Sequence, residues 1–509
     1  MGVRSEPRDD IADMPDLGAP DYQVARFLLE RGLAAIYLVA FVVAWRQFPA
    51  LCGERGLEPA PRFLKLVPRL LDAPTLFRWI RYTDAKLRAL SAVGIAVAAS
   101  LLLGVPQAAP LPVTMLAWFL LWAGYQSIVN IGGSFYSFGW ETLLLEAGFL
   151  AVFLGNDAIA PPIVVLFAFR WLAFRVEFGA GLIKLRGDRC WRELRCMDFH
   201  HETQPMPNPL SWLFHRLPRR LHRIEVLGNF FAQLVLPFGL FLPQPFATVA
   251  ALLMIATQLY LVVSGNYAWL NWVTIVVMTA ALADPVLAAV GRFVSPTVAI
   301  TAPAFDATPV WFTGAVLMLA LVIVVLSWFP VRNLLSPYQA MNASFDPFRL
   351  VNTYGAFGSV SRNRDEVIVE GTDAPAIEPG TTWRQYEFKG KPGDLRRLPP
   401  QFAPYHLRLD WLMWFLPLSS RYGERWFVPF LIKLLEGDRP TLALLRSNPF
   451  PGEPPRFVRA RLYRYRFTTP AERRETGAWW SRTLIGEYMP PVTLRERGAP
   501  GHAAEVSAA

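Results

Sequence analysis

Cysteine is scarce in this chain, which holds three among its 509 residues: Cys52, Cys190 and Cys196. Three cysteines are too few to build a disulfide scaffold. Helix packing and an ordinary apolar core must therefore stabilise the fold. We also expect no signal peptide, because residues 1–26 are polar and acidic and show neither a basic start nor a cleavage site. We expect that stretch to be a loose polar tail.

The sequence also lacks the signatures of common enzymes. No Ser-His-Asp, Walker or dinucleotide-binding pattern occurs in a suitable context. The run HHETQP at 200–205 lacks the two histidines, four residues apart with a glutamate between them, that mark a zinc-protease helix. Prolines at 205, 207 and 209 also argue against the helix that such a motif needs. We therefore favour a non-enzyme over an enzyme and predict no cofactor.

Metal binding has little support from spacing. Histidines and cysteines gather between residues 190 and 222, but their intervals match no standard ligand pattern. We predict no metal site and expect local packing or hydrogen bonding for the four histidines of this region, His200, His201, His215 and His222.

Long apolar runs are what the sequence has in abundance. Hydrophobic residues make up 53% of the chain, and they are concentrated before about residue 329 in runs long enough to cross a bilayer. We predict nine spans, at 27–45, 87–105, 111–131, 140–154, 163–185, 226–242, 246–264, 270–290 and 310–329. The net charge of +10 is attributed to contact with lipid headgroups, so membrane lipids are expected partners and nucleic acid is not.

The chain divides into four predicted regions. A polar tail (1–26) precedes a multi-pass membrane domain (27–330) with extramembrane loops at 46–86 and 186–225, and a β-rich C-terminal domain (331–492) precedes a disordered tail (493–509). The β-rich prediction comes from RDEVIVEG, TWRQYEFKG and RFVRARLYRYRF, which alternate or carry many β-formers between Pro and Gly breaks. The expected fold class is a multi-pass α-helical membrane domain followed by a soluble α+β or β-sandwich-like domain.

The span predicted at 163–185 carries four charged side chains, Arg170, Arg175, Glu177 and Lys184. Seven-residue steps place positions 170, 177 and 184 on one helix face, and charge in hydrocarbon needs partners. Glu141 and Glu146 of the preceding span are the candidate counter-ions. A charge network that fixes helix packing is favoured over a reaction centre built on Lys184, Glu177 and Arg170, and both interpretations stay open.

Two features of the sequence predict opposite sides of the membrane for the C-terminal domain. With nine spans the domain shares a side with loops 46–86 and 186–225, which are rich in Arg and Lys, whereas connections 106–110 and 155–160 have none. The positive-inside rule then places the domain in the cytosol. A structural disulfide between Cys190 and Cys196, favoured over a redox pair because the C-x-x-C spacing is absent, argues for the opposite side.

Seven strings identify the chain as similar to the lipase maturation factor family, in order from about residue 27 to 492. Three lie in the helical part: FGWETLLLEAGFL (138–150), FRVEFGAGLIKLRGDRCWRELRCMDFHHETQPMPNPLSW (174–212) and SGNYAWLNW (264–272). Four lie in the tail: LVNTYGAFGSV (350–360), WRQYEFKGKPGD (383–394), PYHLRLDW (404–411) and NPFPGEPPRFVRARLYRYRF (448–467).

The resemblance implies a membrane-anchored factor that helps secreted proteins mature. Animal members sit in the endoplasmic reticulum membrane, assist homodimeric lipases and hold the C-terminal domain in the lumen, so we expect this tail on the non-cytosolic side. The composition also suits a bacterial member in the cytoplasmic membrane, whose exported client need not be a lipase. A thiol oxidoreductase is a further candidate partner.

Client binding is expected to use aromatic and apolar surface of the tail, for which WLMWFLP (411–417) is a candidate. The most family-like strings supply the candidate residues, which can equally be turn and core residues: Asn352, Tyr354, Asp410, Trp411 and Trp414.

The chain departs from the family at four positions. Gly390 and Pro400 stand where members carry two cysteines, which fits the loss of one disulfide, and Phe230 and Gln233 stand where members carry His and Glu. Roles of those residues in other members are therefore not transferred to this chain.

A shorter likeness supports an alternative function. GAGLIKLRGDRCW (179–191) is similar to a segment of vitamin K-dependent carboxylase and its bacterial relatives, in which the lysine matching Lys184 is thought to act as a base. The alternative is a membrane-embedded enzyme acting on a lipid-soluble cofactor or substrate. Because the likeness covers about a dozen residues, it favours a shared membrane fold over shared chemistry.

Overall fold

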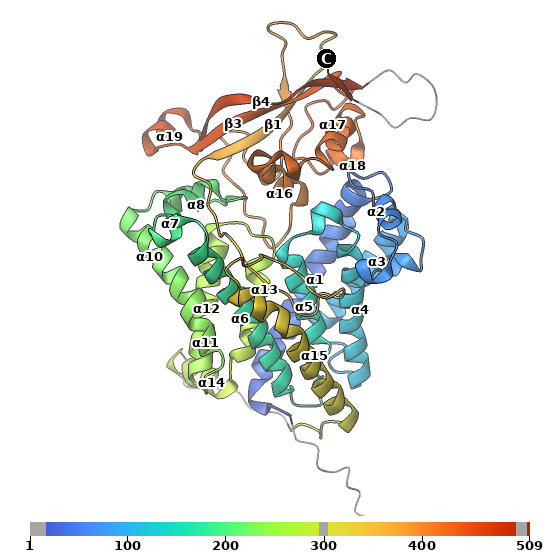
Figure 1. Cartoon of the computed structure of the whole chain (residues 1–509), viewed down its shortest axis with the longest axis vertical. Coiled ribbons are helices and arrows are strands. Elements are labelled where there is room, and N and C mark those ends of the chain that lie inside the picture. The colour runs from blue at the N-terminus through green and yellow to red at the C-terminus, as the bar shows by residue number, and fades with distance from the viewer. Residues whose placement is uncertain (1–16, 295–303, 495–505, 509) are drawn as a thin grey trace, which may run out of the picture.

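The computed structural model describes residues 17–294, 304–494 and 506–508, so the tails predicted at 1–26 and 493–509 lie largely outside the described residues. A bundle of long helices forms one part of the molecule, and a small sheet with short helices covers one end of it (Figure 1). The long helices are α1 (Gln23–Cys52), α3 (Asp84–Leu103), α4 (Leu111–Val129), α5 (Gly139–Ala151), α6 (Ile163–Arg186), α12 (Phe246–Ser264), α13 (Leu270–Met278) and α15 (Val310–Leu335).

Shorter helices fill the connections between the long ones. Standard caps bound the long helix α3: the Thr83 hydroxyl accepts a hydrogen bond from the Lys86 amide at its start, and Gly104, with φ of 90°, ends it. The short helices are α2 (Ala60–Leu66), α7 (Arg189–Arg192), α8 (Met197–Thr203), α9 (Ser211–His215), α10 (Arg219–Phe230), α11 (Leu236–Gly239) and α14 (Asp284–Val294).

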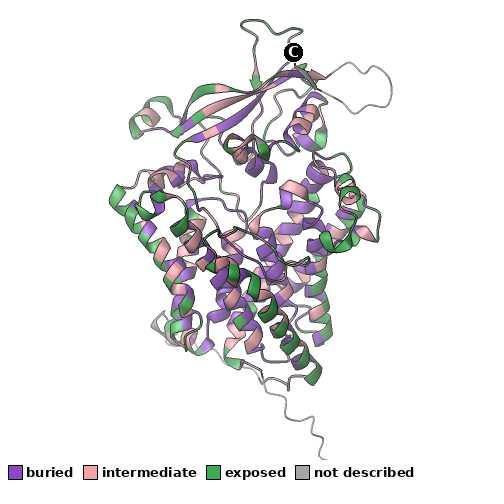
Figure 2. Cartoon of the chain, viewed as in Figure 1, coloured by how far each residue is buried: buried purple, intermediate pink, exposed green. Residues whose placement is uncertain are grey.

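Five helices among the described residues are long and apolar enough to cross a membrane: α1, α3, α4, α12 and α15. A sixth span is added if α13 and α14, which belong to a segment bent by 99°, are counted together. Apolar side chains of α15 face outward, with Val324 71% and Trp328 64% exposed, as expected for contact with lipid (Figure 2). The expected helical membrane domain is confirmed, and the count of nine spans stays a prediction.

When α13 and α14 are counted together as one span, three of the nine predicted spans are not among these helices, each for a physical reason. Helix α5 has 13 residues and is about 20 Å long, short of the roughly 30 Å of bilayer hydrocarbon. Helix α6 has 24 residues but carries the charged stripe. The segment at 226–242 is divided between α10, a π-helical turn at Phe231–Val235, and α11.

The C-terminal part contains one antiparallel sheet in the order β2-β1-β3-β4-β5. Its central pairing runs from Arg364 opposite Tyr465 to Thr372 opposite Phe457. The described residues form no second sheet, so the α+β expectation describes this part and the sandwich expectation does not. The strands are β1 (Arg364–Thr372), β2 (Arg384–Gln385), β3 (Phe457–Phe467), β4 (Trp480–Leu494) and β5 (Val506–Ala508), with helices α16 (Arg408–Phe415), α17 (Phe427–Leu435), α18 (Arg439–Leu442) and α19 (Pro470–Thr476).

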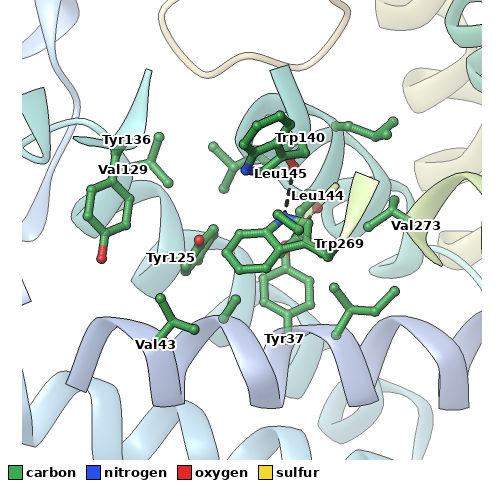
Figure 3. Close-up of a cluster of buried hydrophobic side chains, with 14 of the residues drawn as sticks. Tyr37, Val43, Tyr125, Val129, Tyr136, Trp140, Leu144, Leu145, Trp269 and Val273 are labelled. Carbon is green, nitrogen blue, oxygen red and sulfur yellow. Dashed lines mark hydrogen bonds between the residues drawn. The ribbon is translucent and has the colours of Figure 1, made fainter. Parts of the chain in front are cut away.

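Aromatic side chains from four helices or their flanking residues meet in the bundle core (Figure 3). Tyr37 of α1 donates a hydrogen bond to the Leu144 carbonyl of α5 at 3.0 Å, and the Trp269 indole donates to the Trp140 carbonyl at 3.1 Å. Tyr125 of α4 packs edge-on against Tyr37, with ring centres 5.8 Å apart. Because the polar atoms of Tyr37, Tyr125 and Trp269 have partners, the core fixes α5 in a defined position.

Candidate functional site

The Glu146 carboxylate of α5 is buried where the helices meet the tail. It forms an ion pair with Arg175 of α6. The same carboxylate accepts hydrogen bonds from the Asn352 backbone amide at 3.0 Å, the Asn352 side chain at 2.8 Å and the Tyr354 hydroxyl at 2.8 Å. Arg175 also donates to the Asn352 carbonyl at 2.6 Å. Glu146 thus joins two membrane-domain helices to the start of the tail.

A second buried carboxylate on α5, Glu141, binds a later part of the tail. The Arg408 guanidinium lies 2.8 Å from it, and the Tyr125 hydroxyl donates to its other oxygen. Arg408 also covers the Tyr136 ring at 3.4 Å and donates to the Phe135 carbonyl at 2.7 Å. Removing one partner of such a buried ion pair is costly, because the other charge is left uncompensated.

His406 lies beside this ion pair and is fully buried between aromatic rings. Its ring centre is 5.2 Å from Trp140 and 5.6 Å from Trp269. Burial, together with the nearby Arg408 charge, lowers the pKa of His406 to about 3, so the imidazole is neutral at physiological pH. Arg408 therefore supplies the positive charge that Glu141 binds.

The charged stripe of α6 does not form a single centre. Arg170 donates to the Ala280 carbonyl at 3.1 Å and lies over the Phe167 ring at 4.6 Å. Glu177 accepts a hydrogen bond from the Gln258 amide of α12 at 2.5 Å. Lys184 donates to Gln233 at 2.7 Å. The three side chains share a face, but only Arg170 stands apart: Glu177 and Lys184 attract each other as a buried pair, and both interact with Gln233.

Lys184 therefore has fixed partners rather than an open approach. Its ammonium group binds the Gln233 carbonyl oxygen and lies 5.5 Å from the centre of the Trp191 ring. Gln233 is one of the positions where the sequence analysis expects a departure from the family. The arrangement holds the charge of Lys184 in place.

The loop after α6 is closed by the disulfide between Cys190 and Cys196, whose Cα atoms are 4.8 Å apart. The Trp191 indole beside it donates to the Phe357 carbonyl at 2.9 Å. Asp188, which caps α7, binds Arg362 at 2.8 Å, and this pairing lowers the pKa of the Asp188 carboxyl. Because the loop contacts the tail directly, the two lie on the same side of the membrane.

The residues predicted to bind clients are mostly interior. Asn352, Tyr354, Asp410 and Trp411 are each less than 5% exposed, and Trp414 is half-buried. Asp410 accepts hydrogen bonds from the amides of Gly390 and Lys391, and burial raises the pKa of its carboxyl. The string 411–417 does not form the expected exposed surface, because α16 lies between the sheet and the bundle and is covered from both sides (Figure 1).

A further buried ion cluster lies where the sheet meets the loop. Glu366 of β1 binds Arg364 at 2.7 Å and Lys391 at 2.9 Å, and all three side chains are inaccessible to solvent. Arg364 also donates to the carbonyls of Glu202 at 3.0 Å and Pro205 at 3.1 Å in the loop. The sheet is thus fastened to the same loop that carries the disulfide.

Sequence reasoning missed most partners of the buried charges. Some of the missed residues are polar positions inside apolar or aromatic strings: Gln233, Gln258, His406 and Arg408. That signal marks them as interior groups but does not say which partner each one meets. The others, Arg364, Glu366 and Lys391, lie in or next to polar strings and carry no such signal.

Comparison with known proteins covers both parts of the chain. Residues 24–289 match the lipase maturation factor transmembrane domain and residues 350–490 match the lipase maturation factor C-terminal domain. Lipase maturation factor 1 of Bos taurus is 42% identical over 516 residues, which cover 94% of this chain and 91% of that protein. The Homo sapiens protein is 41% identical over 510 residues, covering 93% and 89%.

More distant relatives match over a similar share of this chain. Lipase maturation factor 2 of Homo sapiens is 29% identical over 600 residues, covering 93% of this chain and 83% of that protein. No solved structure matches the chain. Because both domains of one family match in order, and identity above 40% extends over more than nine-tenths of the sequence, the chain belongs to the lipase maturation factor family.

Proposed function

We propose that this protein is a membrane-anchored maturation factor that helps secreted clients, lipases or other exported proteins, to fold and assemble. The observation that carries the proposal is the 42% identity to lipase maturation factor 1 across the membrane helices and the tail together. A factor of this kind needs a tail held in a fixed position beside the membrane, and the buried pairs at Glu141 and Glu146 supply that hold.

In this proposal the residues named for client binding act by positioning the tail. Asn352 and Tyr354 bind Glu146, and Asp410 holds the Gly390 turn, so their side chains are engaged inside the protein. Trp414 is half-buried, with its indole donating to the Thr203 carbonyl at 3.2 Å. The proposal therefore assigns direct client contact to other surface of the tail.

We place the tail and the loop at 186–225 on the non-cytosolic side of the membrane, as the disulfide favours. The membrane is the endoplasmic reticulum membrane in an animal cell or the cytoplasmic membrane in a bacterium, and a thiol oxidoreductase of the same compartment is the candidate catalyst for the disulfide. Exposed apolar side chains next to α2, such as Leu71 at 62% and Trp79 at 71%, support contact of this region with lipid. The proposal keeps α6 as a span, its charges being paired inside the bundle, and keeps the count of nine.

The sidedness can be tested by labelling. Gly452 lies in an exposed loop of the tail, and a side chain added there would meet no atom within 4 Å. In a bacterial host, where the chain lies in the cytoplasmic membrane, a Gly452→Cys variant should react with a membrane-impermeant thiol reagent in intact cells or in sealed right-side-out vesicles. The native chain is the matched control, because its one free cysteine, Cys52, is buried. Labelling of Gly452→Cys only after permeabilisation would overturn the placement.

The function is tested by restoring a client. A secreted homodimeric lipase is expressed in cells that lack their own lipase maturation factor, with and without this chain, and dimeric active lipase is measured in the medium. The proposal expects activity per lipase molecule to rise with this chain. An exported non-lipase reporter, secreted equally in both cells, controls for general secretion. Stable expression of this chain with no gain in dimeric lipase would count against a lipase client.

The enzyme alternative is not favoured. It depends on a likeness of about a dozen residues around Lys184, whereas the family match covers both domains. Lys184 is also hydrogen-bonded to Gln233 and buried.

A further inference from the structure

Three side chains from two short helices converge in the loop between α6 and α12. His201 comes from α8, and His222 and Glu225 come from α10, where their three-residue interval places them on one helix face. Their nearest nitrogen and oxygen atoms all lie within 4.8 Å of one another. His201 and His222 are buried and Glu225 is mostly so, with side chains 1%, 3% and 12% exposed. The fold thus brings together residues that the sequence separates.

His201 is the first sign that a ligand belongs at this cluster. Neither of its ring nitrogens has a hydrogen-bond partner, although the side chain is 1% exposed, and one oxygen of Glu225 is also unpartnered. The ring of Phe214 stacks on His201 at 5.4 Å and fixes its plane, so Nε2 lies 3.5 Å from a Glu225 oxygen. Buried polar atoms are almost always satisfied, so an unsatisfied imidazole aimed at a carboxylate indicates a missing electrophile.

His222 gives an independent indication. Its Nε2 faces the Phe214 carbonyl at 3.1 Å and its Nδ1 faces an Asp198 carboxylate oxygen at 3.0 Å. A neutral imidazole has one N–H, and if Nε2 donates it to the carbonyl, Nδ1 presents a lone pair to the carboxylate. Two lone pairs at that distance need a cation between or beside them, either a second proton or a metal ion.

We propose that His201, His222 and Glu225 bind a zinc ion, with Asp198 or a water molecule as the fourth ligand. Two imidazoles and a carboxylate suit zinc, whereas magnesium and calcium prefer sets of oxygen ligands. Zinc bonds of about 2.1 Å in tetrahedral geometry separate neighbouring donors by about 3.4 Å. His201 Nε2 and a Glu225 carboxylate oxygen already lie 3.5 Å apart. Side-chain rotation would bring the more distant ligand atoms, which lie within 4.8 Å of one another, to the same spacing.

The surroundings of the three ligands match the outer contacts of a zinc site. The Phe214 carbonyl accepts from His222 and sets which ring nitrogen faces the metal, and the Tyr260 hydroxyl of α12 donates to Glu225. The ion would fasten α8 to α10, as the disulfide closes the loop at Cys190 and Cys196. The loop at 186–225 would then be cross-linked near both ends, by the disulfide near its start and by the zinc ion near its end.

Metal content of the full-length protein tests the proposal. The protein is expressed with added zinc, purified in detergent without chelator and measured by inductively coupled plasma mass spectrometry. We expect about one zinc per chain, and at least a fivefold loss in His201→Ala and in Glu225→Gln. His215→Ala is the matched control, because His215 lies in the same loop but faces Glu202. Zinc content that is equal in native and His201→Ala protein would overturn the site.

A second measurement does not depend on whether the variants fold. Native protein is stripped with a chelator and titrated with Co²⁺, and the expected result is the intense visible absorption of four-coordinate cobalt, displaced by zinc. Thermal unfolding of the stripped protein should occur at a lower temperature and recover when zinc is added back. Weak six-coordinate cobalt absorption with an unchanged unfolding temperature would refute the metal site.

Discussion

The two glutamates of α5 bind the tail in different ways. At Glu146 the positive charge comes from α6, and the tail adds neutral donors from Asn352 and Tyr354. At Glu141 the tail itself supplies the charge through Arg408. The first carboxylate would remain paired if the tail moved away, whereas the second would be left as a buried unpaired anion. The attachment of the tail should therefore depend far more on Arg408 than on Asn352.

The largest expected effect follows from Arg408→Ala. Removing one member of a buried pair leaves the other charge uncompensated, so the free energy of unfolding should fall by about 3–5 kcal/mol. Thermal unfolding in detergent, followed by tryptophan fluorescence, measures this change. Adding Glu141→Gln to the variant should restore part of the loss, because the uncompensated charge is then gone. Equal stability of native and Arg408→Ala protein would show that the pair does not hold the tail.

A smaller effect is expected from Asn352→Ala. The variant keeps the Glu146–Arg175 pair and loses the 2.8 Å side-chain hydrogen bond to a charged acceptor, for which a cost of about 2 kcal/mol is typical. The same unfolding measurement applies, and limited proteolysis should show earlier cleavage within the tail. A loss as large as that of Arg408→Ala would contradict the distinction between the two glutamates.

The pH dependence of stability tests the Glu141 site further. His406 is neutral in the folded protein, with its pKa lowered to about 3, whereas the unfolded chain takes up a proton below its ordinary pKa near 6.5. Stability is therefore complete above that value and falls as the pH decreases, by about 1 kcal/mol from roughly pH 6.5 to pH 5.5. In a His406→Gln variant this part of the slope should be absent. If stability falls equally with decreasing pH in the native and His406→Gln proteins, the lowered pKa of His406 is refuted.

The smallest effect is expected where the charges lie wholly within the helices. A Glu177→Gln, Lys184→Met double variant removes both charges together, and replacing a buried pair by neutral groups is often close to neutral in stability, so we expect a change within about 1 kcal/mol. Client maturation should persist in the lipase secretion assay. A stable double variant with no maturation would favour the enzyme alternative, and the Lys184→Met single variant would then locate the base.

Local rules account for part of this architecture. The cost of charge in hydrocarbon predicts that Arg175 has a partner on a neighbouring helix, and Glu146 is that partner. The partner of Glu141 is 267 positions away in the chain, and no local pattern relates the two residues. Hydropathy finds apolar runs but not their breaks, so the π-helical turn at Phe231–Val235 could not be foreseen.

The tail shows a second limit of sequence reasoning. An aromatic string such as 411–417 is equally suited to an exposed binding surface and to a covered helix, and the arrangement of domains decides between them. Trp411 is covered because Trp140 packs on it with ring centres 4.8 Å apart. The convergence of His201 with His222 likewise depends on how α8 packs on α10, which spacing does not encode.

The distance in sequence between Glu141 and Arg408 also constrains how the protein is made. Synthesis proceeds from the N-terminus, so α5 enters the bundle before its arginine has been translated. The side chain of Gln47 is translated still earlier relative to its partners, since it binds the carbonyl of His406 and the amide of Arg408. Until that segment emerges and docks, the helices carry an anion without its counter-charge. The charge of Glu141 is therefore paired with Arg408 only after the tail has been made, and a chain truncated before Arg408 would keep that carboxylate unpaired.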